Sequence, residues 1–503
     1  MTKRAIFLTA AMFWAAPGQA AWHKVSSPHF VIYADESPEK LRAFATRLEK
    51  FDKAVRHLRA MGDPPMGDGN RLTVFVVPDV KAVQKLATTT SGLAPNVAGF
   101  YSARSSGSIA IVPKRTQDTS LGDLENQFVF LHEYAHHLMF YDLSVALPQW
   151  YSEGFAEFMS TAAFGKDGSV SLGRPALHRA YSADNNKALP LEKMLSGKYD
   201  KLTEPEWDAL YARGWLLTHY LTFEKSRQGQ LKRYLNDVAQ GKDALTAAQL
   251  AFGDFKLLDR NLHGYIGRGK MSFYKIAAEA LPVGAIKVEP LSAGAAEIMP
   301  LRTRTKVGVN KETAVAHAQQ VRAVAAKYPN DPLVQVTLAE AEYDARQYAA
   351  AEAAADRALA ADPGLIEAMI YKGRAIMERA AEDEKGASFA VARSWFQKAN
   401  KADPEDPEPL MLFHQAQVRD TGRPTPNAIA ALHYASDLAP QDLGLRMQSA
   451  YQYLRDGKLP EARKALAPIA FDPHGGAFGR RARTAIERID AGDSKGAQAE
   501  LEK

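Results

Sequence analysis

The feature that most constrains the fold of this chain is a regular spacing of prolines in its C-terminal part. The intervals between them are 34, 41, 36 and 33 residues, and Ala-rich segments with helical periodicity lie between them. The prolines are Pro329, Pro363, Pro404, Pro440 and Pro473. Because proline stops a helix and small residues let helices pack closely, this spacing predicts repeated pairs of antiparallel helices. The longest interval holds a charged insert, residues 381–385.

A helix-turn-helix unit of about 34 residues is the period of tetratricopeptide repeats, and residues 310–503 resemble such repeats. Gly373 falls where the two helices of a unit should approach closely. The resemblance implies four repeats or nearly so, with a polar final helix after Gly475 as a cap, and a protein partner bound by the repeats. The alternative is a helical bundle without repeats.

The N-terminus has the pattern of a secretory signal peptide. Lys3 and Arg4 precede an apolar run over residues 5–16, and small residues at Gly18 and Ala20 suit cleavage after Ala20. We therefore predict a signal peptide at residues 1–20 and a periplasmic or secreted protein. The alternative is a buried N-terminal helix. The run is too short to span a bilayer, and no later segment is long enough.

The composition limits which partners and which reactive or metal-binding side chains this chain can have. The chain has 503 residues, no cysteine and a formal net charge of +5, from 63 Lys and Arg against 58 Asp and Glu. Without a basic stripe, a nucleic-acid partner has no electrostatic support. Without cysteine, the chain can form no disulfide and no thiolate nucleophile, so a metal site must use His, Asp or Glu.

The N-terminal half predicts an α+β domain over residues 21–281. Strands are expected at 29–33, 72–77 and 108–112, and a helix is expected to begin after the N-cap Ser37. Longer helical patterns cover 124–139, 150–161 and 206–223. Residues 282–309 lack clear periodicity, so we expect a linker there, followed by the helical domain at 310–503.

One helical pattern contains the sequence H-E-x-x-H, from His132 through Glu133 to His136. Residues four apart lie on one helix face, so both imidazoles can bind one metal ion while Glu133 lies beside them. His137 points about 100° away from His136, so we do not expect it to be a ligand. The next helix brings Glu153, in the phrase W-Y-S-E-G-F-A, as a third protein ligand.

This pair of motifs resembles the gluzincin zinc peptidases, the clan of thermolysin and aminopeptidase N, and most closely the bacterial peptidase-MA-type domains. A third match, Tyr211 to Gly214 (Y-A-R-G), resembles the Tyr-x-x-Gly helix of the aminopeptidase branch. The resemblance implies an α+β zincin-like catalytic domain followed by an all-α tetratricopeptide-repeat solenoid. The Gly-x-Met-x-Asn motif that holds a substrate's N-terminus in aminopeptidases is not found, which favours an endopeptidase.

By motif, the resemblance makes His132, His136 and Glu153 the ligands of one Zn²⁺, Glu133 the general base and Tyr211 the donor to the oxyanion. The expected reaction is zinc-dependent hydrolysis of peptide bonds in a protein or peptide substrate. Two alternatives stay open: a repeat scaffold whose peptidase domain is inactive, and a zinc hydrolase of a non-peptide amide in the cell envelope.

Two side chains near these motifs also have open interpretations. Glu157, one turn beyond Glu153, could accept a hydrogen bond from a ligand histidine or could be a solvated helix residue. Tyr211 could be a packed aromatic residue, in which case His219 or Tyr220 would have to supply the oxyanion donor.

Overall fold

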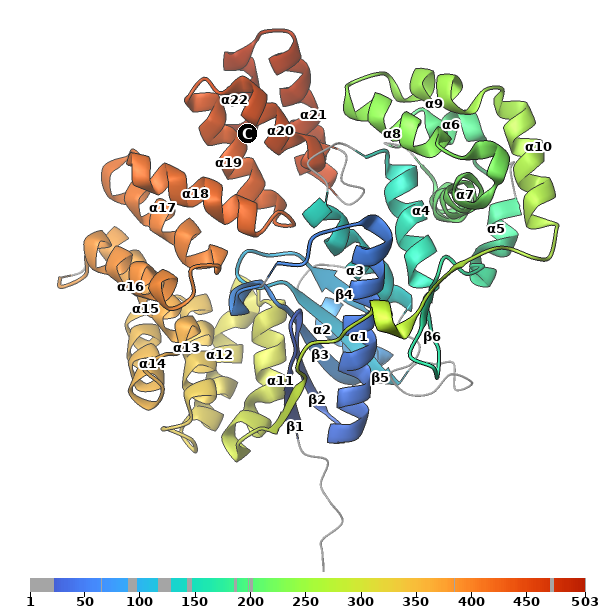
Figure 1. Ribbon diagram of the computed structural model, residues 1–503. Coiled ribbons are helices and arrows are strands. Elements are labelled where there is room, and N and C mark those ends of the chain that lie inside the picture. Colours follow the sequence, from blue (N-terminus) through green and yellow to red (C-terminus); the bar gives the residue numbers. More distant parts are fainter. Residues whose placement is uncertain are drawn as a thin grey trace, which may run out of the picture.

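The computed structural model describes residues 22–64, 66–88, 97–115, 128–142, 147–184, 188–197, 199, 202–383, 385–470 and 475–502. The predicted signal peptide, residues 1–20, lies outside these ranges. Within them, no helix has both the length and the apolar character needed to cross a membrane. Figure 1 shows a central sheet with an arc of helices, α11 to α22, along one side and the group α4 to α10 on the other.

The central sheet has six strands in the order β4-β5-β3-β2-β1-β9. Strands β2, β3 and β5 are parallel to one another, and the other neighbours pair antiparallel. The three strands expected from sequence are β2, β3 and β5. The bounds are β1 Trp22–Ser26, β2 Phe30–Asp35, β3 Leu72–Asp79, β4 Phe100–Ser102, β5 Ile109–Arg115 and β9 Lys287–Pro290. A smaller sheet joins β6 Ala163–Phe164, β7 Val170–Leu172 and β8 Tyr274–Ile276.

Both faces of the central sheet are apolar and buried, because side chains alternate along each strand. On β3, Val74 and Val76 belong to the core shared with α1 and α3, whereas Phe75 and Val77 belong to a second core on the opposite face. Helices α2 and α11 cover that second face. The sheet is therefore the middle layer of three, a layout in which each face needs its own helical cover.

The helices of the N-terminal half carry the site. Helix α1 begins at the predicted cap, where the Ser37 hydroxyl accepts from the Lys40 amide and Pro38 occupies the first turn. The bounds are α1 Pro38–Arg59, α2 Val80–Thr88, α3 Phe128–Asp142, α4 Gln149–Ser160, α5 Ala180–Asp184, α6 Leu191–Leu195, α7 Glu204–Phe223, α8 Gln230–Ala239, α9 Ala244–Phe252 and α10 Phe255–Ile266. A 3₁₀ turn, η2, spans Leu177–Arg179.

The segment 282–309, expected to be an irregular linker, contains strand β9 and helix α11 (Ala293–Val307). The sequence of α11 lacks a clear helical periodicity for two reasons. It carries Pro300 in its interior, and it buries polar side chains such as Arg302 and Thr303 together with Ile298 and Met299. Its solvent-facing positions, Ala293, Glu297, Pro300 and Arg304, mix charged with apolar residues, so the sequence lacks a continuous polar stripe. The sheet lies on one side of the helix and the next helices lie on the other.

Beyond α11 the chain forms antiparallel helix pairs at the predicted spacing. After α12 Lys311–Ala325 come α13 Pro332–Asp344 with α14 Tyr348–Ala361, α15 Ile366–Ala381 with α16 Phe389–Ala402, α17 Pro407–Thr421 with α18 Pro426–Leu438, and α19 Leu443–Arg455 with α20 Leu459–Ala470. Helices α21 Gly476–Asp490 and α22 Ser494–Glu502 follow. The close approach predicted at Gly373 is confirmed, since a Cβ there would lie 2.5 Å from the Phe396 ring.

Candidate metal centre

Helices α3 and α4 bring together the three side chains expected to bind metal. The Nε2 atoms of His132 and His136 lie 3.2 Å apart, and Glu153 Oε2 lies 3.2 Å from the first and 3.4 Å from the second. The two histidines are 9% and 7% exposed, and Glu153 is fully buried. The three atoms thus form a nearly equilateral triangle, as the i and i+4 spacing and the following helix predict.

The triangle fits the coordination of zinc. Zinc holds His nitrogen and carboxylate oxygen at about 2.0–2.2 Å, and two tetrahedral ligands at that radius are separated by about 3.3–3.5 Å. The observed separations of 3.2 to 3.4 Å are close to this value. Two neutral nitrogens and one carboxylate oxygen are also the donor types that catalytic zinc sites use, with a fourth position left for water or substrate.

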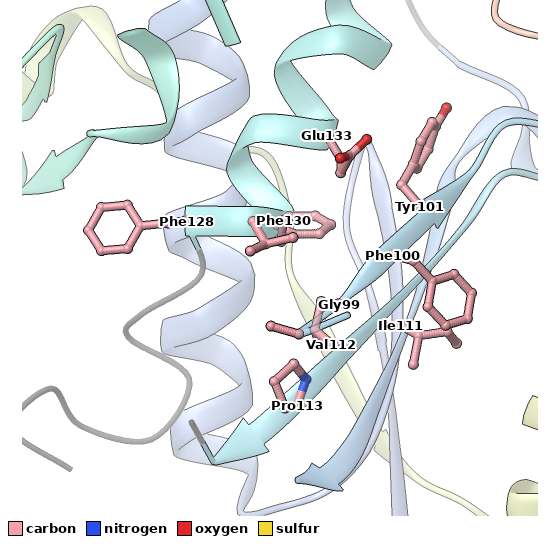
Figure 2. A pocket seen from close by; sticks show the side chains of 11 residues that line it. Gly99, Phe100, Tyr101, Ile111, Val112, Pro113, Phe128, Phe130 and Glu133 are labelled. Carbon is pink, nitrogen blue, oxygen red and sulfur yellow. The ribbon is translucent and has the colours of Figure 1, made fainter. Parts of the chain in front are cut away.

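Glu133 lies on α3 between the two histidines and reaches a cavity of about 190 Å³ between α3 and strands β4 and β5. Figure 2 shows its carboxylate at the end of the cavity near Tyr101, whereas apolar side chains form the rest of the wall. Among these, Phe130 comes from α3, Phe100 from β4 and Val112 from β5. Glu133, which follows His132 in the sequence, is the one carboxylate among the described residues of this wall.

Tyr211 is placed over the triangle by a close crossing of α4 and α7. Its ring centroid lies 5.9 Å from that of His132. At the crossing, Gly154 and Gly214 face each other, and a Cβ on either would overlap a backbone carbonyl of the other helix. The glycine after Glu153 and the glycine of Tyr-x-x-Gly are thus two sides of one contact. Burial, with the nearby carboxylates of Glu153 and Glu133, raises the pKa of Tyr211, so its hydroxyl stays protonated.

Glu157 lies behind His132 and is not a solvated residue. Its Oε1 is 3.6 Å from His132 Nδ1, and its carboxylate accepts hydrogen bonds from His178 Nε2 at 3.1 Å and Arg179 Nη2 at 2.7 Å. Burial would raise the pKa of Glu157, but the hydrogen bonds from His178 and Arg179 outweigh it and lower the pKa to about 2. The ionised carboxylate faces the ring nitrogen of His132 that points away from the triangle.

Arg179 connects this carboxylate to the tyrosine. Its guanidinium carbon lies 5.3 Å from the centre of the Tyr211 ring, and its Nη1 donates to Asp208 at 2.7 Å. Arg179 belongs to the 3₁₀ turn η2, which has no apolar periodicity, so no sequence signal points to it. It holds Glu157 and covers one face of Tyr211 at the same time.

His137 is engaged elsewhere, in line with its exclusion from the ligand set. Its Nδ1 lies 2.6 Å from the Tyr101 hydroxyl, on strand β4. Burial, with the nearby cations Arg56 and His29, lowers the pKa of His137 to about 3. The neutral ring can therefore accept from the tyrosine, which ties α3 to the edge of the sheet.

A second group of His and acidic side chains lies on the other side of α3. His29 Nε2 is 2.9 Å from Asp63 and 3.6 Å from Asp52, and its Nδ1 is 2.7 Å from Glu49. These carboxylates have cationic partners from α1, since Arg56 donates to Asp52 at 2.7 Å and Lys53 pairs with Asp63. The group is an ion-pair network of α1, and the Tyr134 hydroxyl donates to its Asp52 at 2.8 Å.

The alternative oxyanion donors on α7 are committed to the core. His219 is fully buried, with Nδ1 2.9 Å from the Tyr265 hydroxyl and Nε2 3.1 Å from the Gly173 carbonyl. Tyr220 packs against the same Tyr265 ring. Among the tyrosines and histidines of α7, Tyr211 is the one whose ring lies beside His132.

The three donor atoms lie close enough together to hold one metal ion, and a comparison with known families points to a metal-dependent protein. Residues 19–250 match the peptidase family M9 model, described as collagenase, a family of zinc metallopeptidases. The match supports a zinc metallopeptidase with a peptide or protein substrate, and it implies a zinc cofactor. No curated protein matches the chain.

Two solved structures are similar to part of the chain. The first is the MamA RS-1 ArsTM double mutant, which is 16% identical over 40% of this chain and 97% of its own, with a TM-score of 0.27. The second is a thermophilic TPR protein of Thermus thermophilus, which is 18% identical over 38% of this chain and 95% of its own, with a TM-score of 0.30. Each similarity thus covers nearly all of the other protein but less than half of this chain.

The glycine crossing leads to a prediction about metal binding. In Gly214→Ala, the new methyl group would meet the Trp150 carbonyl, so α7 and α4 must separate and Glu153 must move. We expect zinc affinity to fall by roughly 10-fold or more, as when a group that orients a metal ligand is lost. Competition titration with a chromophoric chelator measures this. Gly264→Ala, with open space around its Cβ, is the matched control; equal affinities for the two variants would contradict the assigned role of the crossing.

Proposed function

We propose that this protein is an exported zinc endopeptidase with an α+β zincin-like catalytic domain at residues 21–281 and a tetratricopeptide-type array after it. His132, His136 and Glu153 would hold one zinc ion, Glu133 would act as general base, and Tyr211 would stabilise the oxyanion. The observation that carries the proposal is the triangle of donor atoms with separations of 3.2 to 3.4 Å, together with Glu133, which follows His132 in the sequence and lines a cavity.

The chain's own residues account for the proton transfers. When bound, zinc would supply an acidified water and would polarise the peptide carbonyl. Glu133 projects from the same helix as both histidines, so its carboxylate can take a proton during attack and deliver it to the leaving amine. The apolar side chains beside Glu133 would limit the contact of a bound substrate with water on that side, which would strengthen the electrostatic interactions there.

Tyr211 suits the role of a hydrogen-bond donor to developing negative charge. Its raised pKa keeps the proton on the hydroxyl, and Arg179 covers its ring, so the donor is held in place before the reaction. A donor fixed in advance loses little free energy to reorganisation when the carbonyl oxygen becomes an anion. Glu157, whose Oε1 lies 3.6 Å from His132 Nδ1, would help to hold the His132 ring in orientation from the other side.

The cavity beside Glu133 supports a peptide substrate with an apolar side chain. Its wall is formed by aromatic and aliphatic residues of α3, β4 and β5, and about 190 Å³ is enough for one side chain of moderate size. The test is a digest of a peptide library by the purified protein, with gelatin and collagen as further substrates because the matched family is described as collagenase. Cleavage within peptides, beside apolar residues, supports the proposal.

Binding of a protein partner by the helical array is also part of the proposal. The two other candidate functions are distinguished by the same digest. A zinc-loaded protein that cleaves no peptide but hydrolyses another amide would be a non-peptide hydrolase. A protein that cleaves neither would be a scaffold.

The metal prediction concerns stoichiometry and ligands. The wild-type protein should bind about one zinc ion, and His136→Ala or Glu153→Ala should weaken binding by at least roughly 100-fold, because a three-ligand site loses a ligand. Elemental analysis and chelator competition measure both quantities. His57→Ala removes an exposed histidine and should leave the affinity unchanged. Failure of the wild-type protein to retain or take up zinc would refute the metal centre.

A second prediction tests Glu133. Glu133→Gln keeps the shape of the side chain but cannot accept the proton, so kcat should fall on the order of 10²-fold or more while zinc content stays near that of wild type. Initial rates on a cleaved peptide, together with zinc analysis of the same sample, give the result. Glu39→Gln, at an exposed position of α1, is the control. Substantial activity in Glu133→Gln would rule out Glu133 as the base.

A third prediction separates binding from catalysis at Tyr211. Tyr211→Phe removes only the hydroxyl, so kcat should fall roughly 10- to 1000-fold with little change in KM. Tyr181→Phe is the matched control, because Tyr181 lies on α5 and is 86% exposed. If the two variants turn over peptide at the same rate, Tyr211 is a packing residue and another donor must serve the oxyanion.

A further inference from the structure

Two loops of the N-terminal domain occupy the surface that the helical array, here helices α11 to α22, turns toward the sheet. Loop 66–71 lies on the turn between α16 and α17, where Asn70 Nδ2 donates to the Glu405 carbonyl at 2.8 Å. A Cβ at Gly69 would lie 2.5 Å from the Asp406 carboxyl carbon, so the loop backbone itself is packed on the array. The second loop is the turn 103–108 between β4 and β5.

In that turn, Arg104 binds the end of α11. Its Nη1 and Nη2 donate to the carbonyls of Lys306 and Val307 at 2.6 and 3.0 Å, and its Nε donates to Ser102 Oγ at 3.0 Å. The last carbonyls of a helix have no partner within the helix and form its negative pole, so a guanidinium there satisfies two acceptors and a favourable charge interaction together.

The same turn is bound by the start of α19. The Ser105 amide donates to Asp442 Oδ2 at 2.7 Å, and Asp442 Oδ1 caps α19 by accepting from the Leu445 amide at 2.9 Å. Ser105 is 4% exposed. One carboxylate thus fixes both the first turn of a repeat helix and the tip of the hairpin, which makes the hairpin position depend on the array.

Strand β4 carries this dependence to the cavity beside Glu133. It is three residues long and, within the described ranges, pairs only with β5, so it has few ladder hydrogen bonds of its own. Phe100 and Tyr101 of β4 line the cavity, and the Tyr101 hydroxyl reaches His137 of α3. Figure 2 shows Tyr101 projecting from this strand near Glu133, whereas Phe100 projects beside Ile111.

We propose that the helical array is a fixed support of the β4–β5 hairpin, and that Arg104, Ser105 and Asp442 are positioning residues that set the β4 wall of the substrate cavity. The second half of this statement rests on the proposed peptidase function, whereas the first half does not. The array would thus contribute to substrate binding through an internal interface instead of only through an external partner.

The test uses the full-length protein and two variants. Arg104→Ala removes both donors to α11, and Asp442→Asn keeps the cap on α19 but replaces the acceptor of the Ser105 amide with a donor. Hydrogen exchange of the peptide covering 98–112 should become roughly 10-fold faster in each variant, because local opening of the strand becomes easier. KM for a cleaved peptide should rise several-fold, with kcat and zinc affinity within about twofold of wild type.

Matched controls change the same residue types away from the hairpin. Arg393→Ala removes an arginine that pairs with Asp420 within the array, and Asp254→Asn changes the cap of α10. Unchanged exchange at 98–112 in both test variants overturns the support role. Faster exchange with an unchanged KM overturns the link to the cavity. If the wild-type protein cleaves no peptide, the proposed function fails, and the exchange measurement still decides whether the array supports the hairpin.

Discussion

The structure depends on a sheet that is apolar on both faces. Along β3, Val74 faces one core and Phe75 the other, so neither face can be left in water. Helices α1 and α3 cover one face, and the second is covered by α2 and by α11, which belongs to the start of the helical array. Burial of that second face therefore requires the array to begin beside the sheet, and the contacts of Arg104 and Asp442 follow from this placement.

The site depends on three helices meeting closely enough to bring their side chains together. Helix α3 supplies both imidazoles, α4 the carboxylate and α7 the tyrosine. The crossing of Gly154 and Gly214 permits the approach of α4 to α7, since no larger residue fits there. Arg179 then reaches both Glu157 and the Tyr211 ring. A single cation therefore contacts the carboxylate and the tyrosine that both lie next to His132.

The sequence predicts those parts of the site and fold whose signals are local. The spacing of His132 and His136 on one helix face is a property of helix geometry, and the helix-pair period is fixed by turn prolines. Other parts of the site and fold depend on contacts between segments distant in sequence, and the sequence alone does not predict them. Arg179 lies in a 3₁₀ turn without periodicity, and α11 replaces the expected linker because Pro300 and buried polar residues hide its helical pattern. The assignment of roles to the site residues stays a prediction.

The region that matches the family model is shorter than the region that packs around the central sheet. The family match ends at residue 250, before β9 and α11, yet β9 completes one edge of the sheet and α11 seals one of its faces. A fragment cut where the match ends would expose an apolar surface and an unpaired strand, which promote aggregation. A shorter protein limited to the matched region would therefore need another element to cover this face of the sheet and this edge strand.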